Sequence, residues 1–346
     1  LIFDTVFKKF RMAKKENLKK SDLKIVFMGT PEFAANILGR LFGVEEIEIA
    51  AVVTAPDKPA GRGRSIKTSA VKNIALENDL RILQPTNLKD ASFINELRSV
   101  KADLFVVVAF RMLPEIVWSM PAQGTINLHA SLLPQYRGAA PINWAIINGE
   151  KETGVSTFFI EKEIDTGAII EQQRISIGEN ESVGSLYDRL LIIGGDVIIS
   201  TIIKIKDRTT VPIIQEKINH DKQLKPAPKI FKEDCKINFN LPAHDVHNFC
   251  RGLDPYPGAW CTLYSSSSDS KTFKIFNTRV TDLPIAPDNL LKFNNDGILI
   301  PCSDCYLLVE EIQPAGKRRM TSKDFIAGNK LKSFGLVQES LPSKTP

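Results

Sequence analysis

The chain has 346 residues, of which 43% are hydrophobic and 25% charged; this balance is typical of a globular protein of two domains and excludes a disordered or fibrous chain. No apolar run approaches the roughly 20 residues that a membrane-spanning helix needs. The formal net charge of +5 is no evidence for nucleic-acid binding, because residues 1–24 carry eight basic and three acidic residues and the remainder holds equal numbers of both.

Residues 1–23 form a basic extension without folding signals. The segment has no apolar core followed by small residues, so it does not resemble a signal peptide. We expect it to be disordered or non-native, and we leave it out of the fold prediction.

Segments of strand type alternate with segments of helix type over residues 24–215, which we predict to be the catalytic domain. The strand-like runs are 24–28, 47–54, 80–83, 104–110, 125–129 and 154–161, and the helical runs are 32–42, 70–79 and 183–205. Such alternation predicts an α/β domain with a doubly wound, mostly parallel sheet. Ligands of these folds bind outside the carboxyl ends of the strands.

A second domain is predicted over residues 231–335. A strand-like run at 211–215 and a polar, proline-bearing linker at 216–230 precede it, and a tail at 336–346 follows. It contains a helical run at 243–250 and short extended runs at 259–264, 272–280, 297–301 and 306–312. Closely spaced short strands of this kind predict a small β-barrel.

The five cysteines all lie between residues 235 and 305. An odd number without regular spacing argues against a disulfide framework and fits a reducing cytoplasm. Cys302 and Cys305 form a C-x-x-C motif, but no second pair or suitably spaced histidines accompany it. We interpret them as ordinary thiols and predict no metal site.

Two polar segments follow predicted strands. Asn127 and His129 are two residues apart, so they share one face of a strand, and an amide beside an imidazole is suited to an oxygen that becomes negative during acyl transfer. Asp165 lies in a glycine-containing loop at another carboxyl end, from which it would orient His129 and favour its charged form. Each signal alone also fits a structural histidine or a turn-forming aspartate.

Gly29-Thr30-Pro31 has the appearance of a phosphate-binding turn but lacks the G-x-G-x-x-G spacing. Pro31 at the first helical turn is sufficient to explain it. We therefore do not expect a dinucleotide site.

A basic loop spans residues 56–68. It carries Lys58, Arg62, Arg64 and Lys67, with Lys72 just beyond, against the single acid Asp57. Glycine-punctuated basic loops are suited to phosphate contacts, although a solvated surface loop has the same composition. On this segment alone the two interpretations stay open.

Together these segments resemble the methionyl-tRNA formyltransferase family over nearly the whole chain. The resemblance is carried by Val26–Phe33, by the basic loop, by Asn127-Leu-His129 with Ser131-Leu-Leu-Pro134 and Arg137-Gly138, by Asp165-Thr-Gly167, and by 227–230, 255–257 and 313–317. The Asn-x-His and S-L-L-P-x-x-R-G block is typical of 10-formyltetrahydrofolate transferases in general. The basic loop and the C-terminal segments narrow the choice to the tRNA enzymes.

The resemblance implies a Rossmann-like catalytic domain, a C-terminal OB-like barrel and catalysis by Asn127, His129 and Asp165. It implies 10-formyltetrahydrofolate as co-substrate, initiator methionyl-tRNA as acceptor, and no metal. The residues implied in folate binding are Ser131, Leu132, Leu133, Pro134, Arg111, Met112 and Leu113. Those implied in tRNA binding are Lys58, Arg62, Arg64, Lys67, Lys72, Lys317, Arg318 and Arg319. We expect a cytoplasmic monomer without a membrane partner.

Three other functions stay open at this point. A similar domain transfers formyl groups to glycinamide ribonucleotide or sugar-nucleotide amines, but a small acceptor needs neither the basic loop nor the barrel. A non-catalytic RNA-binding protein would not need the intact set of Asn127, His129 and Asp165. An oxidoreductase would need the missing dinucleotide fingerprint.

Overall fold

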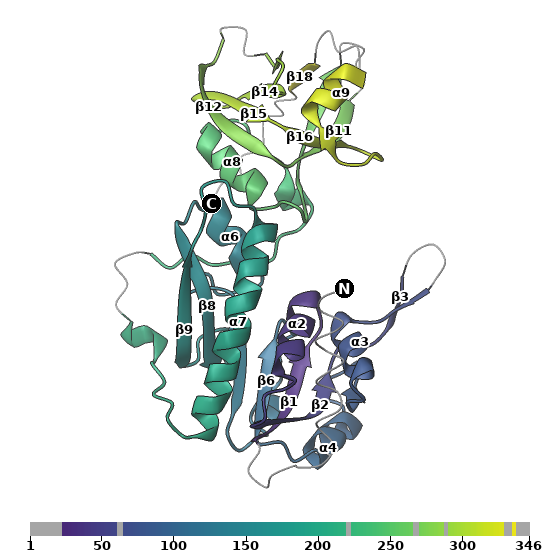
Figure 1. Cartoon of the computed structure of the whole chain (residues 1–346), viewed down its shortest axis with the longest axis vertical. Coiled ribbons are helices and arrows are strands. Elements are labelled where there is room, and N and C mark those ends of the chain that lie inside the picture. Colours follow the sequence, from purple (N-terminus) through teal and green to yellow (C-terminus); the bar gives the residue numbers. More distant parts are fainter. Residues whose placement is uncertain are drawn as a thin grey trace. The chain divides into compact units, whose positions relative to one another are not determined.

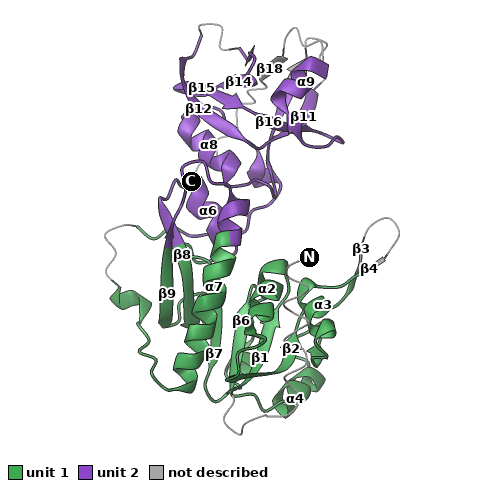
Figure 2. Cartoon of the chain, viewed as in Figure 1, with its two compact units in different colours: residues 1–137, 154–174, 189–225 green, residues 138–153, 175–188, 226–346 purple. Residues whose placement is uncertain are grey.

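The computed structural model describes residues 23–60, 65–218, 223–265, 270–286, 290–328 and 334–336. The described residues form two compact units, coloured separately in Figure 2. Unit 1 comprises residues 1–137, 154–174 and 189–225, and unit 2 comprises residues 138–153, 175–188 and 226–346, in both cases where they are described. The extension up to residue 22, Arg62 and Arg64 lie outside the described residues, so what was predicted for them stays a prediction.

A seven-stranded sheet forms the centre of unit 1 (Figure 1). Its strands are β1 (Leu23–Gly29), β2 (Ile47–Val53), β5 (Ile82–Leu83), β6 (Leu104–Val108), β7 (Thr125–His129), β8 (Glu152–Phe159) and β9 (Ile169–Ser176). They lie in the order β5-β2-β1-β6-β7-β8-β9. The pairs from β5 to β7 are parallel, whereas β8 runs antiparallel to β7. The predicted mostly parallel sheet is confirmed.

Helices cover both faces of this sheet. They are α2 (Glu32–Leu41), α3 (Ala70–Glu77), α4 (Ala91–Ser99), α5 (Glu115–Trp118) and α7 (Val183–Lys206), and the hairpin β3 (Lys58–Ala60) and β4 (Ser65–Lys67) extends from the loop before α3. On one face, Val26 and Met28 of β1 join Phe93 of α4 in a buried cluster. On the other, α7 approaches β7 so closely that a Cβ on Gly194 would lie 3.2 Å from Leu128. This double coverage confirms the doubly wound arrangement.

The turn after β1 has a structural explanation. A Cβ on Gly29 would lie 2.5 Å from the Cβ of Ala34 and 2.9 Å from the carbonyl oxygen of Val108, so only glycine fits. Pro31 is the N-cap of α2, and Glu32 places a negative charge in its first turn. Close packing of β1, β6 and α2 therefore accounts for this turn.

Unit 2 contains two sheets with antiparallel pairing. Its helices are α6 (Pro141–Ile147), α8 (Ala243–Arg251) and α9 (Ser322–Gly328). Its strands are β10 (Ala259–Ser265), β11 (Ser270–Ile275), β12 (Thr278–Pro284), β13 (Lys292–Phe293), β14 (Ile298–Pro301), β15 (Cys305–Val309), β16 (Glu311–Pro314), β17 (Met320–Thr321) and β18 (Phe334–Leu336).

The two sheets have the strand orders β17-β16-β11-β10-β18 and β12-β15-β14-β13. Val246 and Cys250 of α8 share one core with Phe273 of β11 and Leu307 of β15. The predicted C-terminal region of short strands is confirmed, and the strands pair in antiparallel fashion. The described strands form two separate ladders, so the closed OB-like barrel stays a prediction.

Several local predictions differ from the structure. Residues 211–215 are not a strand, because only Ile213 forms an isolated bridge, to Ile169, and a 3₁₀ turn begins at Gln215 (Gln215–Lys217). The strands and helices β9, α4 and α6 were not predicted. In β9, residues 172–174 are exposed at the sheet edge, so the sequence lacks the apolar pattern of a strand. Among the described residues, no helix combines the length and apolar character needed to cross a bilayer.

Candidate active site

Strand β7 carries the first two candidate residues. Asn127 pairs with Val107 of β6, and His129 pairs with Ser156 of β8. Their spacing of two places both side chains on one face of the sheet. His129 is 6% exposed, whereas Asn127 is partly exposed and its amide makes no hydrogen bond to other described residues. An amide left in this state is available to a ligand.

The two nitrogens of the His129 ring face different partners. Nε2 lies 2.8 Å from the carbonyl oxygen of Tyr136. A carbonyl only accepts, so Nε2 carries a proton and donates it. Nδ1 lies 3.8 Å from Oδ2 of Asp165, which is within ion-pair distance but too long for a hydrogen bond. The protein therefore fixes the ring through Nε2 and directs Nδ1 towards the carboxylate.

The direction of β8 does not by itself bring Asp165 close to His129. Ile126 of β7 pairs with Phe159 of β8, so the antiparallel β8 ends opposite the beginning of β7. The loop that carries Asp165 is instead held by Gln215, whose amide nitrogen donates to the carbonyl oxygens of Asp165 at 2.9 Å and Gly167 at 2.8 Å.

The segment predicted to bind folate, Ser131 to Pro134, is held by buried hydrogen bonds. The Ser131 hydroxyl is fully buried and donates to the carbonyl of Gln135 at 2.6 Å. The Ser156 hydroxyl donates to the carbonyl of Ser131 at 2.6 Å and accepts from the amide of Leu133 at 3.1 Å. Leu133 is itself buried, whereas Leu132 is partly exposed. These contacts fix the backbone path of the segment beside His129.

Residues 111–113 differ in their hydrogen bonds and in their burial. Arg111 donates to the carbonyl oxygens of Thr86, at 2.9 Å, and Pro85. Partial burial lowers the pKa of Arg111. Met112 is 67% exposed and Leu113 is buried in the core. Of the three predicted folate contacts, Arg111 and Met112 are exposed, and Met112 is the apolar one of the two.

The basic hairpin has two exposed lysines and one that is already paired. Lys58 and Lys67 lie directly opposite each other on β3 and β4, and both are exposed. Lys72 forms an ion pair with Asp57, which also accepts from Gln84 at 2.9 Å. The hydrogen bonds from Lys72 and then Gln84 lower the pKa of Asp57. Lys72 thus braces the base of the hairpin.

The basic run at residues 317–319 also combines exposed basic side chains with one that is already paired with carboxylates. Lys317 and Arg318 are exposed. Arg319 pairs with Asp254 at 2.6 Å and with Glu311, and its guanidinium lies 4.1 Å from the centre of the Phe276 ring. Its charge is therefore engaged within unit 2.

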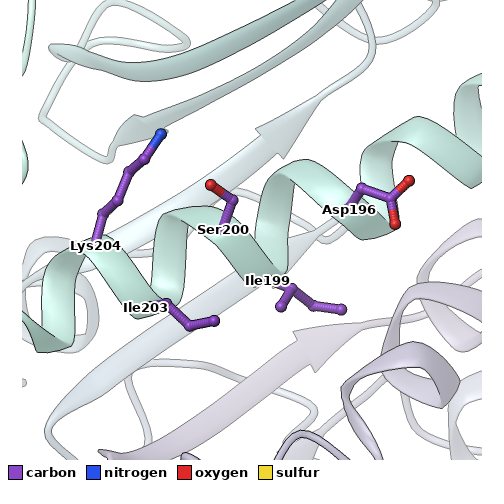
Figure 3. Close-up of a pocket in the computed structure, with 5 residues that line it drawn as sticks. All are labelled: Asp196, Ile199, Ser200, Ile203 and Lys204. Carbon is purple, nitrogen blue, oxygen red and sulfur yellow. The ribbon is translucent and has the colours of Figure 1, made fainter.

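A surface hollow of about 450 Å³ lies elsewhere, along α7 (Figure 3). It is lined by Asp196, Ile199, Ser200, Ile203 and Lys204. None of these is a candidate site residue, and one helix supplies all of them. Of these, Lys204 pairs with Glu171 of β9 at 2.9 Å. The candidate residues around His129 are not among those that line this hollow.

No cluster of three or more His, Cys, Asp or Glu side chains able to hold a metal occurs among the described residues. Cys302 and Cys305 are free thiols in that part of the chain. Burial, followed by the nearby Asp304 and Cys305, raises the pKa of Cys302 to about 12. A thiol in this state is a poor metal ligand.

Sequence reasoning missed the residues that hold the candidate site residues in place. Tyr136 lies inside the S-L-L-P-x-x-R-G block, at a position that the motif leaves open, so its spacing from His129 was the one available signal. Ser156 is one of several polar residues in β8 and gives no periodic signal. Gln215 is separated by 50 residues from Asp165, and nothing in its surroundings distinguishes it.

Two family profiles match the chain. The formyl transferase profile covers residues 23–202, and the profile of the formyl transferase C-terminal domain covers residues 229–330. Among solved structures, an N-formyltransferase from Helicobacter canadensis, in complex with folinic acid and dTDP-3-aminofucose, matches with a TM-score of 0.59 and 21% identity over 84% of this chain and 99% of that one. HypX from Aquifex aeolicus, in complex with tetrahydrofolic acid, matches with a TM-score of 0.58 and 16% identity over 88% of this chain and 47% of that one. These two likenesses show the fold.

Relatives of known name are much closer in sequence. The methionyl-tRNA formyltransferase of Bacteroides thetaiotaomicron is 47% identical over 91% of this chain and 98% of its own length. That of Azobacteroides pseudotrichonymphae is 48% identical over 89% of this chain and 97% of its own length. At this identity and coverage, the chain belongs to the methionyl-tRNA formyltransferase family of transferases.

Proposed function

We propose that the protein transfers the formyl group of 10-formyltetrahydrofolate to the α-amino group of methionine on initiator methionyl-tRNA. One observation carries the chemical part of this proposal: Asn127 and His129 share one face of β7, and Asp165 lies 3.8 Å from the His129 ring. The names of the relatives support the acceptor.

In the proposed reaction the methionine amine attacks the formyl carbon on N10 of the folate, and the carbonyl oxygen becomes a tetrahedral oxyanion. When the carbonyl forms again, the bond from the formyl carbon to N10 breaks, and N10 takes up the proton that the amine has lost, which releases tetrahydrofolate. Asn127 donates one hydrogen bond to that oxygen. His129 donates a second through Nδ1, which requires the imidazolium form because Nε2–H is held by Tyr136. Asp165 orients the ring and accepts the amine proton, directly or through water. Preorganised donors of this kind are typically worth about 10²- to 10³-fold each.

The proposed co-substrate is supported by the folds of the two solved structures, which contain tetrahydrofolic acid and folinic acid. In this proposal the pterin lies against the backbone of residues 131–134 and against the wall at Arg111 to Leu113. Since Ser131 and Leu133 are buried, their side chains shape the segment and its backbone meets the ligand. Met112, as the exposed apolar member of the wall, supplies an apolar contact.

The proposed tRNA contacts are electrostatic. Lys58 and Lys67 are cross-strand neighbours of like charge, an arrangement that costs free energy unless an anion lies between them. A phosphate fits this pair, with Arg62 and Arg64 as further contacts. Lys317 and Arg318 contribute from a C-terminal domain that we propose to be OB-like. Lys72 and Arg319 act as braces of these surfaces, because carboxylates already pair with both.

We further propose a cytoplasmic monomer without a resident metal, with a catalytic domain at 24–215 and a tRNA-binding domain at 231–335. The test offers labelled 10-formyltetrahydrofolate with initiator methionyl-tRNA, elongator methionyl-tRNA and glycinamide ribonucleotide in parallel. Label on the initiator alone supports the proposal. Label on the ribonucleotide, or on no acceptor, refutes it.

A further inference from the structure

Gln215 is a buried residue that joins two loops around the candidate site. Its side chain is 1% exposed. Its amide nitrogen donates to the carbonyl oxygens of Asp165 and Gly167, at 2.9 and 2.8 Å. Its amide oxygen accepts two hydrogen bonds from the Arg137 guanidinium, at 3.1 Å from Nε and 2.6 Å from Nη2. A single side chain thus satisfies four hydrogen bonds.

The two loops that Gln215 joins carry both partners of His129. Asp165 faces Nδ1 of the ring, and Tyr136, the neighbour of Arg137 in the chain, accepts from Nε2. Gln215 therefore links the two segments that carry the groups facing the ring nitrogens.

The backbone at both partners is in a conformation that needs such support. Tyr136 has a φ of 61° and Asp165 a φ of 56°, in the left-handed region that non-glycine residues adopt at a cost. Strained residues keep this conformation only where surrounding contacts enforce it. Hydrogen bonds to the Asp165 carbonyl and to the Arg137 side chain act at, or next to, these two positions.

We propose that Gln215 is a positioning residue for formyl transfer: it holds the Asp165 loop and the Tyr136–Arg137 loop in register, so that the His129 ring keeps its reactive orientation. This inference rests on the role of His129 in the proposed function. The chemistry of the side chain supports it, because an amide both donates and accepts. A carboxylate has no proton for the two carbonyls, and a lysine or arginine has no acceptor for Arg137.

The test compares Gln215→Met with the unaltered protein in steady-state formyl transfer. Methionine keeps the length and much of the volume of the side chain and removes all four hydrogen bonds. We expect kcat to fall roughly 10- to 100-fold, the effect of a displacement of about 1 Å in a catalytic group. The KM values for folate and tRNA should stay nearly constant. Gln173→Met, an exposed glutamine of β9, is the matched control and should keep normal kcat.

A second background separates positioning from general damage to the fold. If Gln215 acts through His129, then Gln215→Met should lower kcat by less than about threefold in a His129→Ala protein, because coupled residues are not additive. An equal loss in both backgrounds would overturn the inference, and so would a normal kcat for Gln215→Met alone. If that variant does not fold, Gln215→Glu takes its place, since it keeps the pairing with Arg137 and loses the donors to the Asp165 loop.

The same experiment distinguishes the two proposals. Absence of transfer to initiator methionyl-tRNA by the unaltered protein would refute the proposed function, whereas a normal kcat for His129→Ala would remove His129 from the mechanism and refute the positioning role with it. If His129→Ala lowers kcat as expected, and Gln215→Met lowers kcat by the same factor with and without His129, the positioning role is refuted and the proposed function is left in place.

Discussion

Replacement of Asn127 by alanine separates catalysis from stability more cleanly than any other change at the site. The side chain is partly exposed and makes no hydrogen bond to other described residues, so its loss removes no hydrogen bond within the described part of the fold. We therefore expect the free energy of unfolding to change by less than about 0.5 kcal/mol, as for an ordinary surface substitution. The whole effect should fall on the transition state.

The expected kinetic loss is that of one oxyanion donor. Removal of such a donor typically lowers kcat by about 10²- to 10³-fold, or roughly 2.7–4 kcal/mol of transition-state stabilisation. Steady-state transfer from labelled 10-formyltetrahydrofolate measures kcat, and filter binding measures tRNA affinity, which should be nearly unchanged. Asn36→Ala, on the exposed side of α2, is the control. A normal kcat for Asn127→Ala would show that this amide does not stabilise the oxyanion.

Three further predictions concern stability and binding. Ser156→Ala should lower the free energy of unfolding in urea by about 1–3 kcal/mol, because the amide of Leu133 loses a buried partner; an unchanged value would contradict this account. Burial and the charge of Arg251 lower the pKa of His247 below its ordinary 6.5, so the unfolded chain binds the proton first. The contribution of neutral His247 to the free energy of unfolding should be fully present above pH 6.5. It should be lost as the pH falls from 6.5 to the lowered pKa of the folded protein, and His247→Gln should remove this pH dependence. Lys58→Ala and Lys67→Ala should each reduce the slope of the logarithm of the tRNA association constant against the logarithm of salt concentration by about 0.7–0.9, whereas Lys72→Met should leave that slope unchanged. Equal slopes for all three variants would refute the phosphate contacts.

The central fold was predictable because its buried strands are apolar on both faces. The run at 104–110 has this pattern, and all five residues of β6 are buried. Edge elements were not predictable in the same way. The exposed part of β9 reads as polar loop, and at 211–215 isoleucines and valine form an extended, mostly exposed segment with a single bridge. Local hydrophobicity does not encode whether a strand partner is present.

The candidate site was predictable where residues lie close together in sequence. The spacing of Asn127 and His129 requires them to share a face if they lie on a strand. The direction of β8 could not be predicted from the sequence, and for that reason neither could the path of the loop that carries Asp165. Nor does the sequence show which basic residues already have partners. Lys72 and Arg319 were grouped with the other predicted tRNA contacts because they belong to the basic loop region and the basic run, whereas the carboxylates that pair with them are not their neighbours in the chain.

The two distances around His129 explain how one imidazole can serve two groups in turn. Nε2 is held at 2.8 Å by a backbone carbonyl, which neither titrates nor changes partner during the reaction. Nδ1 is 3.8 Å from the Asp165 carboxylate, roughly 1 Å longer than a charge-assisted hydrogen bond. The fixed nitrogen defines the plane of the ring, and in the proposed mechanism the distance at the other nitrogen lets Nδ1–H bond first to the oxyanion and then to the carboxylate. Asp165→Asn should therefore lower kcat without changing the KM for folate, and a change confined to that KM would place Asp165 in folate binding instead.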